Sequence, residues 1–458
     1  MAVNIALLNP RYPYEKDQVF LGGSISSIGA RLLAMGHEVD VVDLNMDRIA
    51  DNRTQEALKR ADCIGVSLIG SPYIPGMLEL IDQLRARGVS VPILLGGQVI
   101  ARLEPGQFSR IVAERSSVAQ IRDDHDLAIS LGCSVTDIPS EQGVSFIPLW
   151  ERMGKERMVR YLRHEAALIV SQGCKKRCSF CAASKGREET FREIGVFERD
   201  LRYLADMAQR NGLQTLEFYA SNLDFFQNPL VVALYLRILS AVRNNSGVDI
   251  RVRCLSCMDS FIHATEMVPN LGKLLADAGL YWIGFGVDGA DPGIWKSQHK
   301  AFNKKEDIAR CLVLCQEYGV LGEILMIMGF PNDNAVTLMK SVGACLMSVL
   351  RRRNVRVRPY MEKPVVPGND MWAKGGEMVE KIVANPQLFH NLDFAAIGSP
   401  FTHPRTLHRW MCNAAYLLIW AILWPFGRCN TSPLLPQGQS GLYGRIARWV
   451  NHIMPFDR

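Results

Sequence analysis

Three cysteines stand within eight positions of one another, in the stretch SQGCKKRCSFC at residues 171–181. They are Cys174, Cys178 and Cys181, spaced as C-x3-C-x2-C. Thiolates are soft ligands that suit zinc and iron–sulfur clusters. Structural zinc usually takes four Cys or His ligands, so a zinc site would need a distant fourth ligand. A four-iron cluster on three cysteines would instead leave one iron open, where the amino and carboxylate groups of a small molecule could bind and receive an electron.

The composition favours an ordinary globular protein in a reducing compartment. The chain has 458 residues, 48% hydrophobic and 21% charged, with a formal net charge of +6. This length suits two or three domains, and so mild a charge fits anionic ligands or a membrane surface without calling for nucleic acid. The twelve cysteines are scattered, without the framework of a small secreted protein, so we expect a cytoplasmic protein. The N-terminus lacks a signal peptide's basic region and cleavage site, and we interpret it as a buried first strand.

The elements that must position these residues begin with an alternating pattern in residues 1–145. Short apolar runs alternate with segments of helical spacing, which predicts a doubly wound parallel sheet of the Rossmann-like type. In such sheets ligands bind beyond the carboxyl ends of the strands. From about residue 111 the pattern weakens and predicts an irregular end, followed by a linker at residues 146–164. The predicted strand ends carry Asn9, Ser67, Gly96 and Gly97.

A second alternating pattern occupies residues 165–362. Six apolar strands are each followed by a helix or a turn, which predicts a partial β/α barrel. The three cysteines follow the first of these strands, ALIVS. Active sites of β/α barrels lie at the carboxyl ends of the strands. The cysteines therefore stand where chemistry is expected.

The last part of the chain, residues 363–458, is predicted to be mainly helical. Its stretch TLHRWMCNAAYLLIWAILWPFG is strongly apolar, but the uncharged core at residues 411–426 is shorter than the roughly 20 residues needed to cross a bilayer. Apolar side chains go nearly all the way round this helix, which predicts burial in the protein, closing the barrel and lining a substrate chamber. Peripheral contact with a membrane surface is the alternative.

The cysteine spacing, with aromatic Phe180 before the third thiol and a predicted barrel around it, resembles the radical S-adenosylmethionine superfamily. The resemblance spans about residues 165–370 and implies a [4Fe-4S] cluster on the three cysteines. LEFYASNLDFF stands where the family's second strand ends, IGFGVDG resembles the fourth-strand segment, and MIMGFPND resembles the turn after strand five, with Asp333 in that turn. By resemblance, the residues that contact S-adenosylmethionine are expected to be Ser221, Asn222, Asp224, Asp288, Gly329 and Pro331.

The N-terminal part resembles the cobalamin (B12)-binding domain that precedes the barrel in one branch of this superfamily. The matching stretches are LNPRYP, GARLLAMGHEV, DCIGVSL and ILLGGQ. The D-x-H-x-x-G sequence, whose histidine ligates cobalt in other cobalamin proteins, is absent, as is common in this branch. The resemblance implies cobalamin bound near Asn9, Ser67, Gly96 and Gly97.

The resemblance implies an enzyme that reductively cleaves S-adenosylmethionine to a 5′-deoxyadenosyl radical. With cobalamin it implies methyl transfer to an unactivated carbon of a small-molecule substrate. The apolar C-terminal stretch suggests that this substrate is hydrophobic. An external one-electron reductant, such as a flavodoxin or ferredoxin, would supply electrons to the cluster. One alternative is a radical cyclase, oxidoreductase or rearrangement enzyme without methyl transfer. An alternative of another class is a non-catalytic iron–sulfur binding or sensor protein.

Two further groups of residues could carry chemistry. Cys254 and Cys257 form a C-x2-C at the end of the third barrel strand, and we interpret them as buried free thiols or a second redox site. The arginines of the stretch RRRNVRVR, residues 351–358, could pair with an anionic substrate or simply end a solvated helix.

Overall fold

Two structural units make up the chain in this computed structural model, which describes residues 2–11, 19–183, 186–399, 403, 405–429, 431 and 433–435. Both units are assembled from separate stretches of sequence. The predicted boundaries after residues 145, 164 and 362 remain predictions. The first unit comprises residues 1–167, 192–207 and 375–390, and the second comprises residues 168–191, 208–374 and 391–458.

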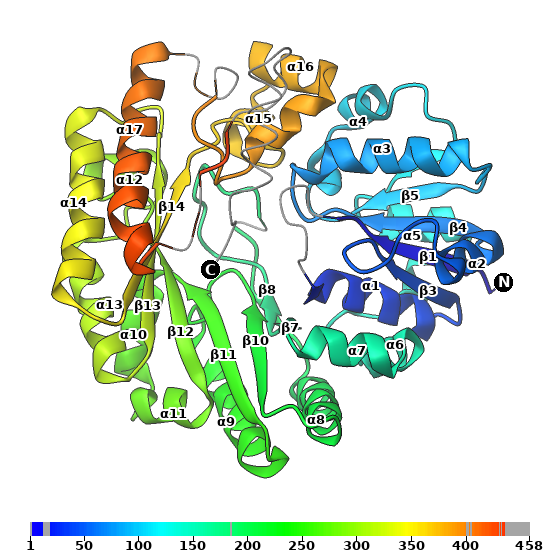
Figure 1. The fold of residues 1–458 in the computed structure, drawn as a ribbon, viewed down its shortest axis with the longest axis horizontal. Helices are drawn as coiled ribbons and strands as arrows, with labels where there is room; N and C mark the ends of the chain where they lie inside the picture. Colours follow the sequence, from blue (N-terminus) through cyan, green and yellow to red (C-terminus); the bar gives the residue numbers. More distant parts are fainter. Residues whose placement is uncertain are drawn as a thin grey trace. The chain divides into compact units, whose positions relative to one another are not determined.

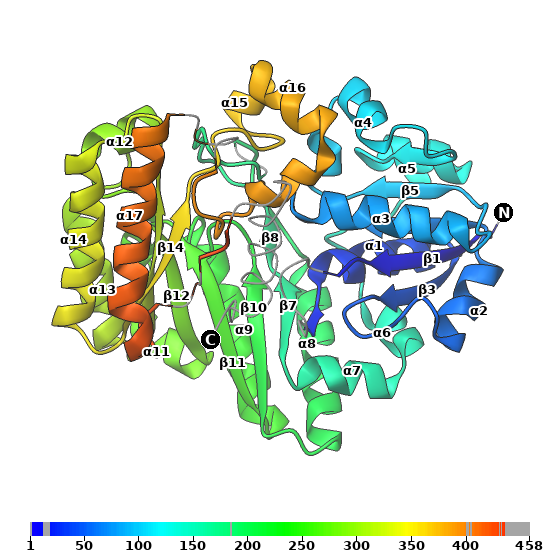
Figure 2. The same ribbon diagram turned by 45° about the horizontal axis from the view of Figure 1, so that its top comes forward.

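The first unit contains the predicted doubly wound parallel sheet, with strand order β3-β1-β4-β5-β6 (Figures 1 and 2). The connection order reverses between β1 and β4, which makes the carboxyl ends of these two strands the expected ligand-binding edge. The strands are β1 (Asn4–Asn9), β3 (Glu38–Asp43), β4 (Cys63–Ser67), β5 (Ile93–Gly96) and β6 (Val118–Gln120). The helices are α1 (Gly23–Ala34), α2 (Asn52–Arg60), α3 (Tyr73–Ala86), α4 (Pro105–Val112), α5 (Asp124–Leu131), α6 (Ile147–Met153) and α7 (Lys155–Leu162).

The stretch that we expected to be irregular, from about residue 111 to residue 148, is regular in part. It contains β6, the edge strand of the sheet, and α5. All three residues of β6 are half-buried, so the strand lacks the apolar pattern that would have predicted it. Helix α5 begins at a side-chain cap, because Asp123 accepts hydrogen bonds from the backbone N–H groups of His125 and Asp126, each at 3.0 Å.

The second unit contains the predicted partial barrel. Its parallel strands run in the order β14-β13-β12-β11-β10-β7, and the two-residue strand β2 (Phe20–Leu21) pairs with the first residues of β7. All six predicted strands are present. They are β7 (Glu165–Ile169), β10 (Thr215–Ser221), β11 (Asp249–Ser256), β12 (Leu280–Gly286), β13 (Leu321–Met328) and β14 (Val355–Met361).

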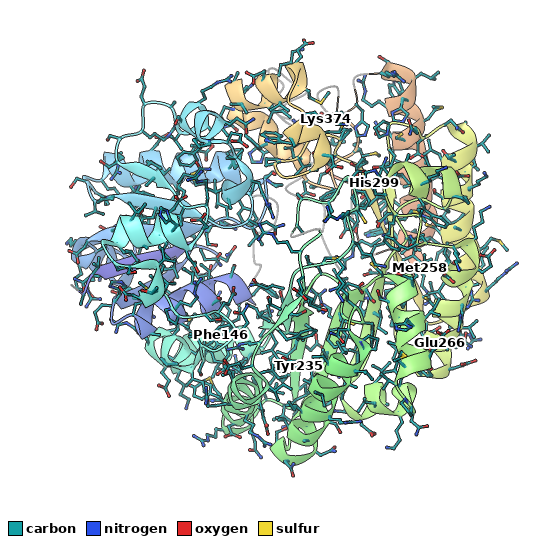
Figure 3. All side chains as sticks on the ribbon, turned by 180° about the vertical axis from the view of Figure 1, so that it is seen from behind. Phe146, Tyr235, Met258, Glu266, His299 and Lys374 are labelled. Carbon is teal, nitrogen blue, oxygen red and sulfur yellow. The ribbon has the colours of Figure 1, made fainter. Side chains whose placement is uncertain are left out.

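Helices cover the outer face of this barrel sheet, where alternate strand residues such as Phe218, Val252 and Phe285 are fully buried. Tyr235 and Met258 pack into this core, whereas Glu266 lies on the surface (Figure 3). Two helices, α10 and α11, separate β11 from β12. The helices of this unit are α9 (Pro229–Ser246), α10 (Met258–Met267), α11 (Leu271–Asp277), α12 (Pro292–Ser297), α13 (Lys305–Glu317) and α14 (Ala335–Arg351). Helix α8 (Ile194–Arg210) begins in the stretch 192–207 of the first unit.

The C-terminal part is mainly helical, with α15 (Asp370–Ala373), α16 (Glu377–Ala384) and the predicted apolar helix, α17 (Thr406–Leu423). Burial of α17 on all sides was expected and is wrong. The helix lies in the outer layer beside α14 and β14, so only the face with Cys412, Tyr416 and Ile419 is buried. Among the described residues, no helix combines the length and apolarity that crossing a bilayer requires.

Candidate active site

The three cysteines lie in a loop that a short hairpin carries at the carboxyl end of β7. Strands β8 (Ser171–Gln172) and β9 (Thr190–Phe191) pair in antiparallel fashion and bring the two ends of the loop together. Gly173 has φ +96°, and a Cβ there would lie 2.2 Å from the backbone oxygen of Glu188, so only glycine fits this approach. Within the loop, the Arg187 N–H donates to the Cys174 carbonyl oxygen at 3.1 Å.

The three thiols are partly shielded from solvent and lie close enough to influence one another's ionisation. Cys178 is buried, and Cys174 and Cys181 are half-buried. Burial raises the pKa of Cys174 to about 11 and that of Cys178 to about 12, and the neighbouring thiols add to both shifts. At neutral pH these two cysteines are therefore protonated unless a cation displaces the protons, as metal binding does.

A buried cation, Lys300, lies beside the thiols. Its Nζ donates to the carbonyl oxygen of Gly286 at 2.6 Å and pairs with the Asp288 carboxylate. Burial alone would lower the pKa of Lys300, but the Asp288 carboxylate, with the nearby Cys257 and Cys178, holds it above its usual value. Asp288 itself has φ +52°, a strained backbone conformation often found at functional sites. The site thus has a permanent positive charge next to the cysteine loop.

The expected contacts at the end of β10 form a second part of the site. Ser221 ends the strand, and Asn222 is buried directly after it. Asp224 is buried and accepts hydrogen bonds from Ser256 Oγ (2.9 Å), Ser260 Oγ (2.6 Å) and the Cys257 N–H (3.0 Å). Asp224 therefore joins the end of β10 to the start of α10, and burial raises its pKa.

The predicted turn after β13 packs against the cysteine loop. Phe330 lies 5.6 Å from Phe180, ring centroid to ring centroid. Gly329 has φ +93°, and a Cβ there would come within 2.8 Å of the sulfur of Met361. Asp333 accepts the N–H groups of Gly329 and Phe330 at 2.9 and 3.0 Å, which closes the turn, and Pro331 is exposed. The structure thus brings the turn, Asp224, Asp288 and the three thiols to one end of the barrel, and their contacts with S-adenosylmethionine remain predictions.

A buried pair of ionisable residues lies at the end of β14, where no sequence pattern had predicted a site. Glu362 is fully buried, and burial raises its pKa to about 8, with Asp288 adding to the shift. Burial likewise lowers the pKa of Lys363 to about 7, while its Nζ donates to the Ala396 carbonyl oxygen at 2.6 Å. The Glu362 Oε2 atom has no hydrogen-bond partner among the described residues. Neither residue stands in a motif, and no spacing in the sequence indicated them.

Neither the C-x2-C cysteines nor the arginines of residues 351–358 come together as one site. Cys254 is buried close to Cys315 of α13, whereas Cys257 precedes α10 and interacts with Cys174, so the two thiols do not form one site. The arginine run also divides. Residues 351–353 lie at the end of α14, while Arg356 and Arg358 lie on β14 with their guanidinium carbons 5.6 and 6.0 Å from the Trp282 ring centroid.

In the first unit, the four residues expected near cobalamin lie at the carboxyl edge of the sheet. Ser67 and Gly96 pair across β4 and β5, and Gly97 follows with φ +91°. A Cβ on Gly97 would lie 2.4 Å from the backbone oxygen of Leu68, so glycine keeps these two loops in contact. Asn9 ends β1 and donates to Asp43 at 3.1 Å. Ile69, in the loop after β4, is 58% exposed and leaves an apolar surface at this edge.

Comparisons with known proteins agree with this architecture. The radical SAM superfamily matches residues 168–343, and the B12 binding domain matches residues 21–113. No curated protein matches the chain.

Solved structures of cobalamin-dependent radical SAM proteins share the fold. The methyltransferase TsrM from Kitasatospora setae, with cobalamin and a [4Fe-4S] cluster bound, has a TM-score of 0.65 at 16% identity over 96% of this chain and 92% of that chain. Its complex with tryptophan and a SAM analogue gives 0.64 at 17% identity, over 98% and 94% of the two chains. OxsB with aqua-cobalamin gives 0.57 at 16% identity, over 86% of this chain and 56% of that chain.

Proposed function

Because the chain is a radical S-adenosylmethionine enzyme with a B12-binding domain, we propose that it transfers a methyl group to an unactivated carbon of a small-molecule substrate. The observation that carries this proposal is the joint presence of the cysteine loop on a barrel and a glycine-lined ligand edge in the first unit. The similarity in fold to a methyltransferase that binds cobalamin and a [4Fe-4S] cluster supports it.

The cysteine loop fits an iron–sulfur cluster by its donor chemistry. Cys174, Cys178 and Cys181 offer three soft ligands, and no disulfide uses any of them. Lys300 holds a positive charge beside Cys178, where it would offset the negative charge of a thiolate-bound cluster. The aromatic contact between Phe180 and Phe330 places apolar side chains against one side of the loop.

The strand ends around the loop fit S-adenosylmethionine. The unpartnered Glu362 Oε2 needs a hydrogen-bond donor, and a ligand's amino or hydroxyl group would supply one. At neutral pH the raised pKa keeps Glu362 largely protonated, so its carboxyl group could also donate a hydrogen bond to the ligand. Asp224 and Asp288 are already held by protein donors, so they would orient the ligand through the groups that they fix.

The edge of the first sheet fits cobalamin. The exposed Ile69 and the glycines at positions 96 and 97 form a surface of small and apolar groups at the ends of β4 and β5, which suits a broad, flat ligand. When bound, these cofactors would supply an electron, a radical and a methyl group, while the protein positions the substrate and excludes water.

Product analysis tests the proposal. The anaerobic enzyme, reconstituted with iron, sulfide and hydroxocobalamin, is given S-adenosylmethionine and a strong reductant, together with small molecules extracted from the source cells. We expect S-adenosylhomocysteine, and a deuterated methyl label from S-adenosylmethionine should appear in one extracted compound. The variant in which all three loop cysteines are changed to Ala is the control and should form neither.

The alternatives predict different products. A radical enzyme without methyl transfer would form 5′-deoxyadenosine but no S-adenosylhomocysteine. A non-catalytic iron–sulfur protein would form neither compound while retaining its cluster. Either result would contradict methyl transfer.

A further inference from the structure

Two outer helices of the second unit, α14 and α17, lie side by side along their whole lengths (Figures 1 and 2). Near the start of both helices, His408 Nε2 lies 3.1 Å from the Phe330 carbonyl oxygen. Near their ends, Arg428 Nη1 donates to the Val355 carbonyl oxygen at 3.3 Å. The helices therefore run parallel and present one continuous outer surface, which we call the α14–α17 face.

The α14–α17 face is apolar although it is exposed. On α17, Leu407 is 74% exposed, Trp410 is 66% exposed and Leu418 is 41% exposed; Val336 and Leu350 on α14 are 64% and 78% exposed. Monomeric soluble proteins rarely leave large contiguous apolar patches in water. Ten of the twenty large apolar side chains that are exposed among the described residues belong to this face: Val336, Met339, Met347, Leu350, Leu407, Trp410, Leu417, Leu418, Ile422 and Phe426.

The formally charged side chains of α14 and α17 themselves are all basic. Neither residues 334–360 nor residues 404–429 contain an aspartate or a glutamate. Arg405 and Arg409 lie at the start of α17, and further basic residues lie where both helices end. These are Arg351, Arg352, Arg353 and Arg428. A positive rim around an apolar centre complements a surface that is apolar inside and anionic outside.

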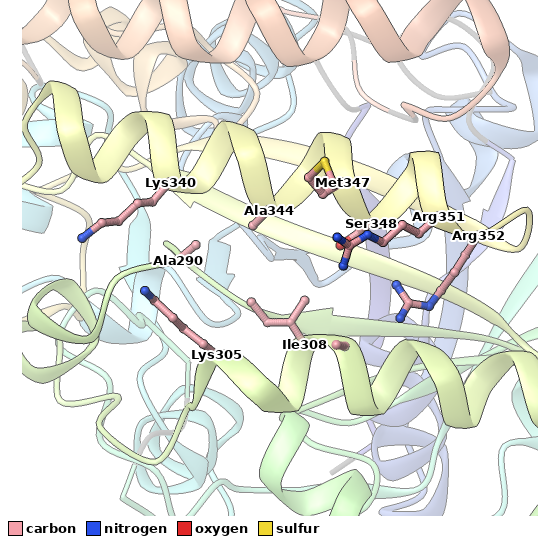
Figure 4. Close-up of a pocket in the computed structure, with 10 residues that line it drawn as sticks. Ala290, Lys305, Ile308, Lys340, Ala344, Met347, Ser348, Arg351 and Arg352 are labelled. Atoms are coloured by element: carbon pink, nitrogen blue, oxygen red, sulfur yellow. The ribbon is translucent and has the colours of Figure 1, made fainter.

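A pocket of about 270 Å³ between α13 and α14 adjoins this face (Figure 4). Lys305 and Lys340 lie at one end of the pocket, and Arg351 and Arg352 lie at the other. Its lining between these cations is apolar except for Ser348 and includes Met347, which also belongs to the α14–α17 face. Lys340 pairs with Asp291 at 2.6 Å, so one carboxylate partly balances the four cations. Such a pocket suits a phosphate group joined to an apolar chain.

We propose that the α14–α17 face docks onto the surface of a bilayer that contains anionic phospholipids, with a lipid phosphate in the pocket between α13 and α14. Leucine and phenylalanine side chains of the face would enter the acyl boundary, Trp410 would lie at headgroup level, and the arginines would contact lipid phosphates. This inference is independent of the methyl-transfer proposal.

A second copy of the chain fits the α14–α17 face less well. A two-fold interface brings the same surface of both subunits together. Since both ends of the face carry arginines and no acidic residue belongs to either helix, either orientation would place cations against cations. An anionic membrane supplies the opposite charge.

Vesicle co-sedimentation of the full-length, cofactor-loaded protein tests the proposal. We expect binding to vesicles of phosphatidylcholine with about one third phosphatidylglycerol, and little binding to phosphatidylcholine alone. Salt of about 1 M, which shortens the Debye length to about 3 Å, should weaken the binding. Trp410→Ser with Leu417→Ser should abolish it. Arg351→Glu with Arg353→Glu should weaken it at least tenfold, since each basic residue contributes roughly fivefold.

The matched control is Leu230→Ser with Leu234→Ser on α9, where the same number of exposed large apolar side chains is removed elsewhere. It should bind as the wild type does, and all variants should keep their cluster content. The proposal is overturned if the wild type stays in the supernatant with anionic vesicles, or if the face variants bind unchanged. A wild-type dimer that Trp410→Ser with Leu417→Ser dissociates, without vesicle binding, would show that a second copy covers the face.

Discussion

At the scale of single residues, the thiols of the hairpin loop differ from the other cysteines of the chain in their surroundings. Changing Cys174, Cys178 and Cys181 together to Ala should abolish the cluster, because no other three thiols share a loop at the strand ends. Iron and acid-labile sulfide analysis after anaerobic reconstitution measures this. Cys257→Ala is the control, since this thiol interacts with Cys174 but lies outside the loop, and it should keep full iron content. Full cluster content in the triple variant would refute the assignment.

Glu362 gives a pH dependence whose sign can be stated. Its pKa is raised from the ordinary 4.5 to about 8 in the folded protein, so folding takes up a proton between these values. Stability must then fall as pH rises through this window, by about 1.4 kcal/mol per pH unit. Glu362→Gln should remove this fall in stability, because the glutamine amide does not titrate. Between pH 5 and 7, before the folded protein loses the Lys363 proton at a pKa of about 7, the variant should gain on the order of 2–3 kcal/mol relative to wild type.

Urea unfolding at several pH values measures this difference in the free energy of unfolding. Glu380→Gln removes a surface carboxylate of α16 that pairs with Arg110, and it should change stability equally little at each pH. A constant difference between Glu362→Gln and wild type would mean that Glu362 is charged in the folded protein.

At the scale of elements, Gly97 holds the ends of β4 and β5 together. Gly97→Ala should destabilise this edge because the backbone has φ +91° and the new Cβ would meet the Leu68 backbone at 2.4 Å. Gly88→Ala, with φ +78° and nothing within 4 Å, is the matched control for the backbone conformation alone. The control should cost about 1–2 kcal/mol, and Gly97→Ala about 1–3 kcal/mol more. Hydrogen exchange of the β4 and β5 amides measures both, and equal effects would contradict the close approach.

Much of this architecture could be predicted from the sequence because it rests on local signals. The six barrel strands alternate with helices at regular spacing, and the three thiols of the C-x3-C-x2-C stretch lie in one loop because they are close in sequence. Lys300 could not be found in this way, since its partner Asp288 lies on the other side of α12 in the sequence and only the fold brings the two together. Strand β6 was missed because an edge strand with half-buried residues has no apolar pattern.

The outer face of α17 shows a different limit. Apolar residues all round a helix predict burial, but the pattern cannot tell packing against protein from packing against a partner that the sequence does not contain. Leu407 and Trp410 are exposed, whereas Tyr416 and Ile419 at equally apolar positions are buried. Only the position of the helix in the outer layer distinguishes them.

At the scale of the whole molecule, the first unit depends on residues far along the chain. Asp200, in the stretch 192–207, accepts hydrogen bonds from Ser145 Oγ at 2.5 Å and the Phe146 N–H at 2.9 Å, and forms a buried ion pair with Arg192. Trp150 stacks on Tyr203 with 6.1 Å between ring centroids. A fragment of residues 1–167 should therefore aggregate or unfold without a cooperative transition, because these buried groups lose their partners.

Circular dichroism during heating measures this, and residues 1–207 form the matched fragment that restores Asp200 and Tyr203. A sharp transition in the shorter fragment, equal to that of the longer one, would show that the stretch 192–207 is dispensable.

The interleaving of the two units has a consequence for how the protein is made. A ribosome releases the chain from the N-terminus onward, and the first unit lacks α16, which packs on α4, until residue 390 has emerged. The five strands of its sheet therefore remain without α16 while most of the barrel is being synthesised. During that time the surfaces that will receive α8 and then α16 are open in turn to chaperones. Codon usage between residues 167 and 390 would then set how long the carboxyl edge of the nascent sheet stays exposed before the first unit is complete.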